Sequence, residues 1–409
     1  MKKLFLLALL ALLLVNSGIA KGTKTKVVTL ATIHGLHLQS KYTYQDVIRA
    51  IDTYKPDLIC LEIRPEEFRA KTYLQEMMYA TAYGDLNKIA VAPIDWYTGD
   101  AKRNDRTIRD SLMKLDNYKA MQRQLDSLEN ASEIMKAFTA KYGQNIFQRK
   151  DLGFEFYNGD DFNGYNREYY RLSISIFGDS PVNLSAVTRN KKMTQRIIDA
   201  VKKYKAKRVV VLCGGEHKSI IEDFLNENGT VEVLSASSIL PLNDYKLSDV
   251  MVSARPNLYF TKVDTAEANS YYSSMISPLL MKKHSMPSFS ENDYFDLSTV
   301  GKVLQNWEKD VPTSATMMYE QAWYNFLVKN YDKCIEYANA FLQSPNLNKQ
   351  DVPDFFAYRL LGFSYDMKND RAAALESYKK GKAAMAEKKM KEEMVNSLLG
   401  KYETTPFVR

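Results

Sequence analysis

The sequence predicts an α/β protein with a parallel-containing sheet flanked by helices, followed by an all-helical region. Three observations predict this architecture. The chain has 409 residues, which suits two domains. Short β-branched runs alternate with helical patterns up to about residue 235, and paired helical patterns begin at about residue 311. Strands that alternate with helices form a parallel sheet covered on both faces.

The first twenty residues have the pattern of a secretory signal peptide. Lys2 and Lys3 precede an unbroken apolar run of twelve residues from Leu4 to Val15, and small residues surround Ala20, where we expect cleavage. This run is shorter than the roughly 20 residues that a membrane-spanning helix needs. We expect an exported protein, periplasmic or secreted, with no membrane span in the mature chain. An uncleaved anchor is the alternative.

The composition excludes several classes of protein. With 45% hydrophobic and 26% charged residues, the chain is neither disordered nor collagen-like. The net charge of +7 is modest and spread along the chain, so we expect no nucleic-acid partner. Three cysteines cannot build a disulfide framework. Cys60 and Cys213 lie in apolar runs, where cysteine is usually a core residue.

The α/β domain is expected to span residues 21–245, with its elements in regular alternation. Residues 153–164, rich in Gly, Asn and Asp, are expected to form a surface loop. Residues 246–310 are expected to end the domain and connect it to the helical region, with a strand-like run at 258–263. We expect strands at 27–30, 57–63, 88–94, 208–212 and 231–234, and helices at 44–54, 105–142, 191–204 and 217–226.

Small residues recur in the helical region, residues 311–409. Ala322, Cys334 and Ala338 mark one helix pair, and Gly362 and Gly381 belong to a similar pattern about 40 residues later. The pattern resembles the tetratricopeptide repeat, in which small residues let two helices approach closely, with an insertion near 346–352. Such repeats present a groove to peptides, so we expect them to dock a protein partner. A generic helical cap is the alternative.

Two histidines occupy equivalent places after two strands. His34 and His217 each lie three residues after a small residue at the end of a strand. In an open parallel sheet the carboxyl ends of the strands form the crevice that binds ligands. Glu62 ends the strand at 57–63, so its carboxylate is expected to face the same crevice. Two imidazoles and a carboxylate suit a divalent metal ion, with Mn, Co, Zn and Fe left open.

Two further histidines are less clearly placed. His37 lies three residues after His34, so it is either another metal ligand or a supporting or surface group, and both readings stay open. His284 lies beside two lysines and is expected to be solvated. A core or surface histidine remains the alternative for His34 and His217 as well.

Several short motifs follow one another in order over residues 27–235. They are Ala31-Thr32-Ile33-His34, Pro56-Asp57 leading to Glu62, Pro93-Ile94-Asp95 followed by Arg103, Arg106 and Arg109, Arg189-Asn190, and Gly214-Gly215-Glu216-His217. Their order and spacing resemble the TraB/TIKI group of the erythromycin esterase-like and ChaN-like superfamily. Ala31 in place of a glycine, the extra Gly35-Leu36-His37 and Thr188 before the Arg-Asn pair depart from the family pattern.

The resemblance implies an erythromycin esterase/ChaN-like fold but no single reaction, because the family includes metal-dependent peptidases, esterase-like enzymes, a haem-binding branch and pheromone-shutdown proteins. A metal held by His34 and His217 would activate water to hydrolyse an amide or ester, with a peptide favoured. Glu62, if it is not a ligand, or Glu216 would be the general base.

The remaining matching residues are candidates for binding substrate. Arg189 or an arginine at 103–109 is expected to stabilise the oxyanion or hold a substrate carboxylate. Asp95, Arg103 and Arg106 are the expected substrate-binding residues. A cap or an ion-pair partner is the alternative for Asp95, and a solvated helix face is the alternative for the arginines at 103–109. Asn190 is either part of the site or a helix cap. The alternative function is a non-catalytic protein that captures a peptide, haem or metal in the same crevice.

Overall fold

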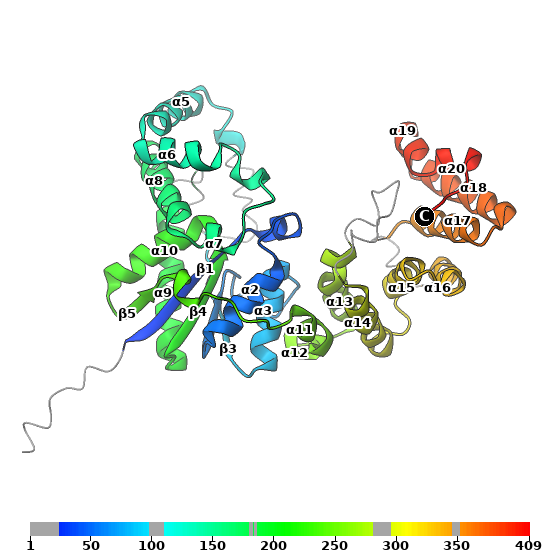
Figure 1. Cartoon of the computed structure of the whole chain (residues 1–409), viewed down its shortest axis with the longest axis horizontal. Helices are drawn as coiled ribbons and strands as arrows, with labels where there is room; N and C mark the ends of the chain where they lie inside the picture. Colours follow the sequence, from blue (N-terminus) through cyan, green and yellow to red (C-terminus); the bar gives the residue numbers. More distant parts are fainter. Residues whose placement is uncertain (1–23, 98–109, 180–182, 184–185, 281–295, 346–351) are drawn as a thin grey trace, which may run out of the picture.

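The computed structural model describes residues 24–97, 110–179, 183, 186–280, 296–345 and 352–409 (Figure 1). The predicted signal peptide lies outside the described residues, as do Arg103, Arg106, Arg109, His284 and most of the predicted insertion. Within the described ranges, no helix combines the length and apolar character that crossing a bilayer requires.

A sheet of five parallel strands forms the centre of the first half of the chain. The strands are β1 (Thr25–Thr32), β2 (Leu58–Leu61), β3 (Ala90–Pro93), β4 (Arg208–Gly214) and β5 (Val231–Leu234). Their order across the sheet is β3-β2-β4-β1-β5. Every neighbouring pair is parallel, with Thr32 opposite Gly214 at the carboxyl edge. The predicted α/β class and all five predicted strands are confirmed.

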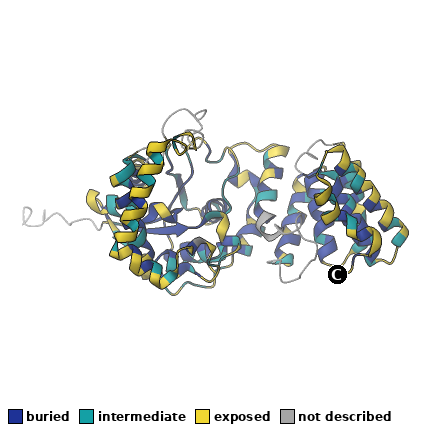
Figure 2. Ribbon diagram, turned by 90° about the horizontal axis from the view of Figure 1, so that it is seen from above, coloured by how far each residue is buried: buried dark blue, intermediate teal, exposed yellow. Residues whose placement is uncertain are grey.

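Helices cover both faces of this sheet, as the alternating strand pattern requires. Val28 and Leu30 of β1 belong to the same buried cluster as α2 and α3. Val27 points to the opposite face, in a cluster with α9 and α10. The buried residues lie in the strands and along the inner faces of the helices, and the outer faces of the helices are exposed (Figure 2). The bounds of these helices are Tyr44–Tyr54 for α2, Gln75–Leu86 for α3, Ala186–Tyr204 for α9 and Gly215–Asn228 for α10.

The surface loop predicted at residues 153–164 is wrong, because this stretch is helical. Its Gly, Asn and Asp residues mark the ends of helices: Gly153 and Gly159 precede α7 and α8, and two aspartates occupy the first turn of α8, where the helix dipole favours them. These helices pack with α5 and α6 above the sheet (Figure 1). The bounds are Asp116–Ala131 for α5, Glu133–Tyr142 for α6, Phe154–Tyr157 for α7 and Asp160–Phe177 for α8, with short 3-10 turns at Ile146–Gln148 and Ala236–Ile239.

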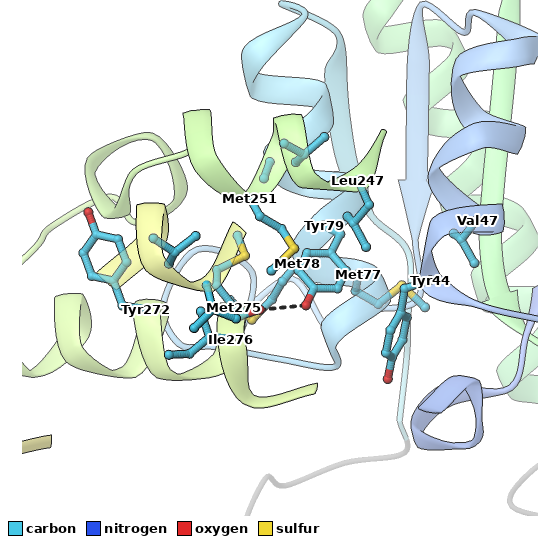
Figure 3. Close-up of a cluster of buried hydrophobic side chains, with 14 of the residues drawn as sticks. Tyr44, Val47, Met77, Met78, Tyr79, Leu247, Met251, Tyr272, Met275 and Ile276 are labelled. Carbon is cyan, nitrogen blue, oxygen red and sulfur yellow. Dashed lines mark hydrogen bonds between the residues drawn. The ribbon is translucent and has the colours of Figure 1, made fainter. Parts of the chain in front are cut away.

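The described elements between Leu247 and Asp310 are helices, so the strand predicted at 258–263 is also wrong. Pro256 stands at the first position of α12, where its fixed φ favours a helix. Methionines and tyrosines of α3 pack against α11 and α13, and the Tyr79 hydroxyl donates to the Met275 carbonyl at 2.8 Å (Figure 3). The bounds are Leu247–Ser253 for α11, Pro256–Tyr259 for α12, Thr265–Leu280 for α13 and Leu297–Asp310 for α14.

Two pairs of helices follow, as predicted, at the far end of the molecule from the sheet (Figure 1). A Cβ added to Gly362 would lie 2.2 Å from the Tyr378 ring, so glycine permits the close approach of α17 and α18. A tetratricopeptide identity for these pairs remains a prediction. The bounds are Ala315–Leu327 for α15, Tyr331–Gln343 for α16, Asp354–Met367 for α17 and Arg371–Glu387 for α18, followed by short helices at Glu392–Val395 (α19), Asn396–Gly400 and Lys401–Thr404 (α20).

Candidate functional site

The predicted site residues follow four adjacent strands and therefore gather at one edge of the sheet. Asp95 follows β3, Glu62 follows β2, Gly214 ends β4 and His34 follows β1. A pocket of about 310 Å³ opens at this edge. Its lining includes Thr32, His34, Leu36, Phe162, Gly214, Glu216 and His217. The two histidines that the sequence singled out thus line one pocket.

His34 begins a 3-10 turn, His34–Leu38, and its ring is oriented by a carboxylate on α3. Its φ of 50° lies in the left-handed region, a strained conformation that often accompanies a functional role. The Nδ1 atom is 2.7 Å from Oε1 of Glu76, whose side chain is fully buried while that of His34 is 39% exposed. Because a carboxylate only accepts, we assign the Nδ1 proton to this hydrogen bond, which leaves Nε2 free to accept a proton.

The surroundings of His34 raise its pKa. Burial alone would lower the pKa, but the hydrogen bond and charge of Glu76, with smaller contributions from Glu62 and Glu216, outweigh burial. Sequence reasoning missed Glu76, because it lies on a helix and not at a strand end. The one signal available was an acidic residue directly before the apolar run Met77-Met78-Tyr79.

Gly214 gives the His34 ring its space. A Cβ at Gly214 would lie 2.9 Å from Nε2 of His34 and 3.4 Å from Oε2 of Glu62. The Gly214 N–H also donates to Oε2 of Glu62 at 2.6 Å. Glycine is therefore needed for the close approach of the strand end to both side chains.

Arg189, in the first turn of α9, connects three of the predicted site residues. Its guanidinium contacts Oε1 of Glu62 at 2.8 Å, Oδ1 of Asp95 at 2.8 Å and Nε2 of His217 at 3.1 Å. The Glu62 and Asp95 charges raise the pKa of Arg189 above its ordinary value although burial, the largest influence, opposes them. Arg189 is thus held on three sides by this chain.

His217 is neutral, and its hydrogen bonds define which nitrogen carries the proton. Nδ1 donates to Oδ1 of Asn190 at 2.8 Å, and Nε2 accepts from Arg189. Burial lowers the pKa of His217 to about 4. Asn190 lies inside α9 and not at its end, so its reading as a helix cap is wrong. The side chain orients His217 instead.

The two carboxylates of this network differ in pKa. Burial favours the neutral form of Glu62, but the charges of His217, Arg189 and His34 and the Gly214 N–H together lower its pKa. Burial dominates at Asp95 and raises its pKa despite the contact with Arg189. Glu216 lines the pocket, where the loss of hydration of its carboxylate and the negative charge of Glu62 raise its pKa.

His37 does not belong to the pocket, so its reading as a metal ligand is wrong. The ring is buried, Nε2 accepts from the Ile33 N–H at 3.2 Å, and Nδ1 donates to the Tyr42 carbonyl at 2.8 Å. Both nitrogens are used in bonds to the backbone, where the imidazole stabilises the turn after β1. The supporting role that the sequence left open is the one the geometry favours.

The predicted metal ligands do not fit a metal ion in their present arrangement. Within the described ranges, no three His, Cys, Asp or Glu side chains are grouped so that they could hold one. The Nε2 lone pair of His217 and Oε1 of Glu62 both face Arg189. The divalent metal therefore remains a prediction from the sequence.

No protein-family model, curated protein or solved structure matches this chain. The fold and the pocket define an α/β protein with a histidine-lined crevice at the carboxyl edge of a parallel sheet. The resemblance to the TraB/TIKI group stays a prediction.

Proposed function

We propose that this chain hydrolyses an amide or ester bond, with a peptide as the favoured substrate, in the pocket at the carboxyl edge of the sheet. One observation carries the proposal: the ring of His34 lines a solvent-accessible pocket while the fully buried Glu76 holds its Nδ1 at 2.7 Å. A carboxylate that orients an imidazole is the arrangement by which enzymes prepare a general base.

His34 would activate the attacking water. Its Nε2 accepts a proton from water in the pocket, and the buried charge of Glu76 stabilises the imidazolium that forms. The protonated ring then donates to the leaving group. This assigns the role of base to His34, where the sequence had suggested Glu62 or Glu216. Both Glu62 oxygens already accept hydrogen bonds, from Arg189 and from the Gly214 N–H.

The amino end of α10 would stabilise the oxyanion. Gly214, Gly215, Glu216 and His217 line the pocket; Gly214 immediately precedes this 14-residue helix, and the other three form its first turn. The first N–H groups of a helix have no acceptor inside it and carry partial positive charge, so they suit a developing negative charge. Arg189, predicted for this role, is instead held by three groups of the chain and positions Glu62 and His217.

Turnover by purified variants tests the proposal. Against a panel of fluorogenic peptides and p-nitrophenyl esters, His34→Ala and Glu76→Gln are expected to lower kcat/KM by about 10²- to 10⁴-fold, the range of general-base catalysis. Glu227→Gln is the control, because Glu227 is exposed at the far end of α10. Equal activity of His34→Ala and the wild type would refute the proposal.

The binding-protein alternative predicts a different result from the same panel. Its support is the set of paired helices beside the α/β domain, since such arrays commonly hold peptides. A ligand bound tightly and recovered intact, with no product, would favour it. We further propose that the protein acts outside the cytoplasm, on the pattern of residues 1–20.

A further inference from the structure

Glu216 lines the pocket together with His34 but has no part in the proposed mechanism. Its carboxylate makes no hydrogen bond or ion pair with any residue that the structure describes. The carboxylates of Glu62 and Glu76, at the same edge of the sheet, are both engaged, the first by Arg189 and the second by His34. Glu216 is therefore a solvent-accessible acidic group for which the described part of the chain supplies no partner.

The charges around Glu216 leave the pocket negative. Loss of hydration and the charge of Glu62 raise the pKa of Glu216, and the charges of His34 and Arg189 offset this only in part. Arg189 is already held by the carboxylates of Glu62 and Asp95, and His34 is neutral when it acts as a base. A positively charged group beside Glu216 would therefore be stabilised, because it would meet a carboxylate that is not yet neutralised.

The apolar walls of the pocket suit the carbon chain of a basic side chain. Ile33, Leu36 and Phe162 form this part of the lining. The Phe162 ring lies directly against the start of α10, because a Cβ added to Gly215 would lie 2.9 Å from it. Lysine and arginine bury their apolar stems on such surfaces while the charged head reaches a polar group, here the carboxylate of Glu216.

Tyrosines of α8 lie near the same carboxylate. Helix α8 packs on α10. Burial raises the pKa values of Tyr165, Tyr169 and Tyr170, and the negative charge of Glu216 raises them further. The faces of aromatic rings attract cations, so these rings and the carboxylate favour a cation over a neutral group.

We propose that Glu216 selects the substrate in this pocket by binding a positively charged amino or guanidinium group of a peptide, next to the bond that is cleaved. The inference rests on the proposed function, because His34 and Glu216 line the same pocket. Its volume of about 310 Å³ is at the low end for ligand sites, which suits one basic residue better than a long peptide. The charge belongs either to a lysine or arginine side chain or to the free amino terminus of a peptide.

Three matched aminomethylcoumarin amides separate these two sources. Acetyl-lysine amide carries a side-chain cation, norleucine amide with a free amino terminus carries only an α-amino cation, and acetyl-norleucine amide carries neither. The wild type is expected to cleave one of the cationic amides with a kcat/KM about tenfold higher than that of the neutral amide, which is the gain expected from one hydrogen bond to a charged group.

The variant Glu216→Gln removes the charge and keeps the shape of the side chain. It is expected to reduce the ratio of kcat/KM between the cationic and neutral amides to about one, chiefly through KM, because the lost contact binds the substrate. Glu227→Gln is the matched control, because Glu227 is an exposed glutamate at the far end of the same helix. This control should keep the wild-type ratio.

Binding without turnover distinguishes failure of this inference from failure of the proposed function. Isothermal titration with the three corresponding carboxamides, which lack the coumarin, should show about tenfold tighter binding of a cationic one, and Glu216→Gln should lose this preference. If this holds while no amide is hydrolysed, the proposed function fails and the inference stands.

Two other results overturn the inference. One is hydrolysis in which the wild type treats all three amides equally, or in which Glu216→Gln keeps the cationic preference; the proposed function then stands alone. The other is a wild-type protein that neither binds nor cleaves any of the three, in which case both fail.

Discussion

The substitution Gly214→Ala would disturb the pocket without straining the backbone. The residue has φ −53° and ψ 142°, which any amino acid adopts, so the substitution acts only through its new methyl group. That methyl would lie 2.9 Å from Nε2 and 3.4 Å from Cε1 of His34. An unstrained contact needs about 3.5 Å, so the ring must move by roughly 0.6 Å.

The expected cost falls on catalysis more than on stability. A displacement of about 1 Å in a catalytic group costs about 10²-fold, so a shift of roughly 0.6 Å predicts about a tenfold lower kcat. The free energy of unfolding should fall by only about 1 kcal/mol, because the partly exposed ring of His34 can yield toward the pocket.

Three measurements decide this prediction. The turnover assay gives kcat, urea unfolding gives stability, and NMR of the imidazole C–H signals reports the His34 ring, since the chain has four histidines. Gly35→Ala is the control, because a Cβ there meets no atom within 4 Å. Wild-type kcat and an unmoved His34 signal in Gly214→Ala would refute the close approach on which the pocket geometry depends.

Three further predictions concern charge, packing and helix propensity. Glu76 raises the pKa of His34, so Glu76→Gln should move the rise of kcat/KM with pH to lower pH; an unchanged midpoint would exclude His34 as the base. Phe407 is buried among three aromatic rings, so Phe407→Ala should lower the free energy of unfolding, measured in urea, by about 3 kcal/mol. Val408 is 81% exposed, so the control Val408→Ala should lower it by under about 0.5 kcal/mol. Equal effects of the two substitutions would contradict the packing. Gly164 lies within α8 with open space around it, so Gly164→Ala should raise the melting temperature through about 0.5–1 kcal/mol of stability, and a decrease would show that the helix is strained there.

The local sequence pattern predicted the bounds of an element correctly where the element has a regular apolar period and a clear end. The helix at Tyr44–Tyr54 was predicted to the residue, because Thr43 caps it and Pro56 follows its end. The pattern failed at residues 153–164, where turn-forming residues precede the four-residue helix α7 and the 18-residue helix α8 instead of forming a loop. The same composition serves both, and only burial of Phe154 and Phe162 against the sheet domain decides between them.

The sequence by itself determined which side chains stand at the strand ends: His34, Glu62, Asp95 and His217. Their positions follow from chain order and from the rule that parallel strands share one carboxyl edge. Only the tertiary structure decided what faces them. Glu76 reaches His34 from 42 residues away, and Arg189 reaches Glu62 from 127 residues away. Such partners depend on how helices pack against the sheet, a long-range arrangement that no local period records. They decide that His34 meets a carboxylate and His217 a guanidinium.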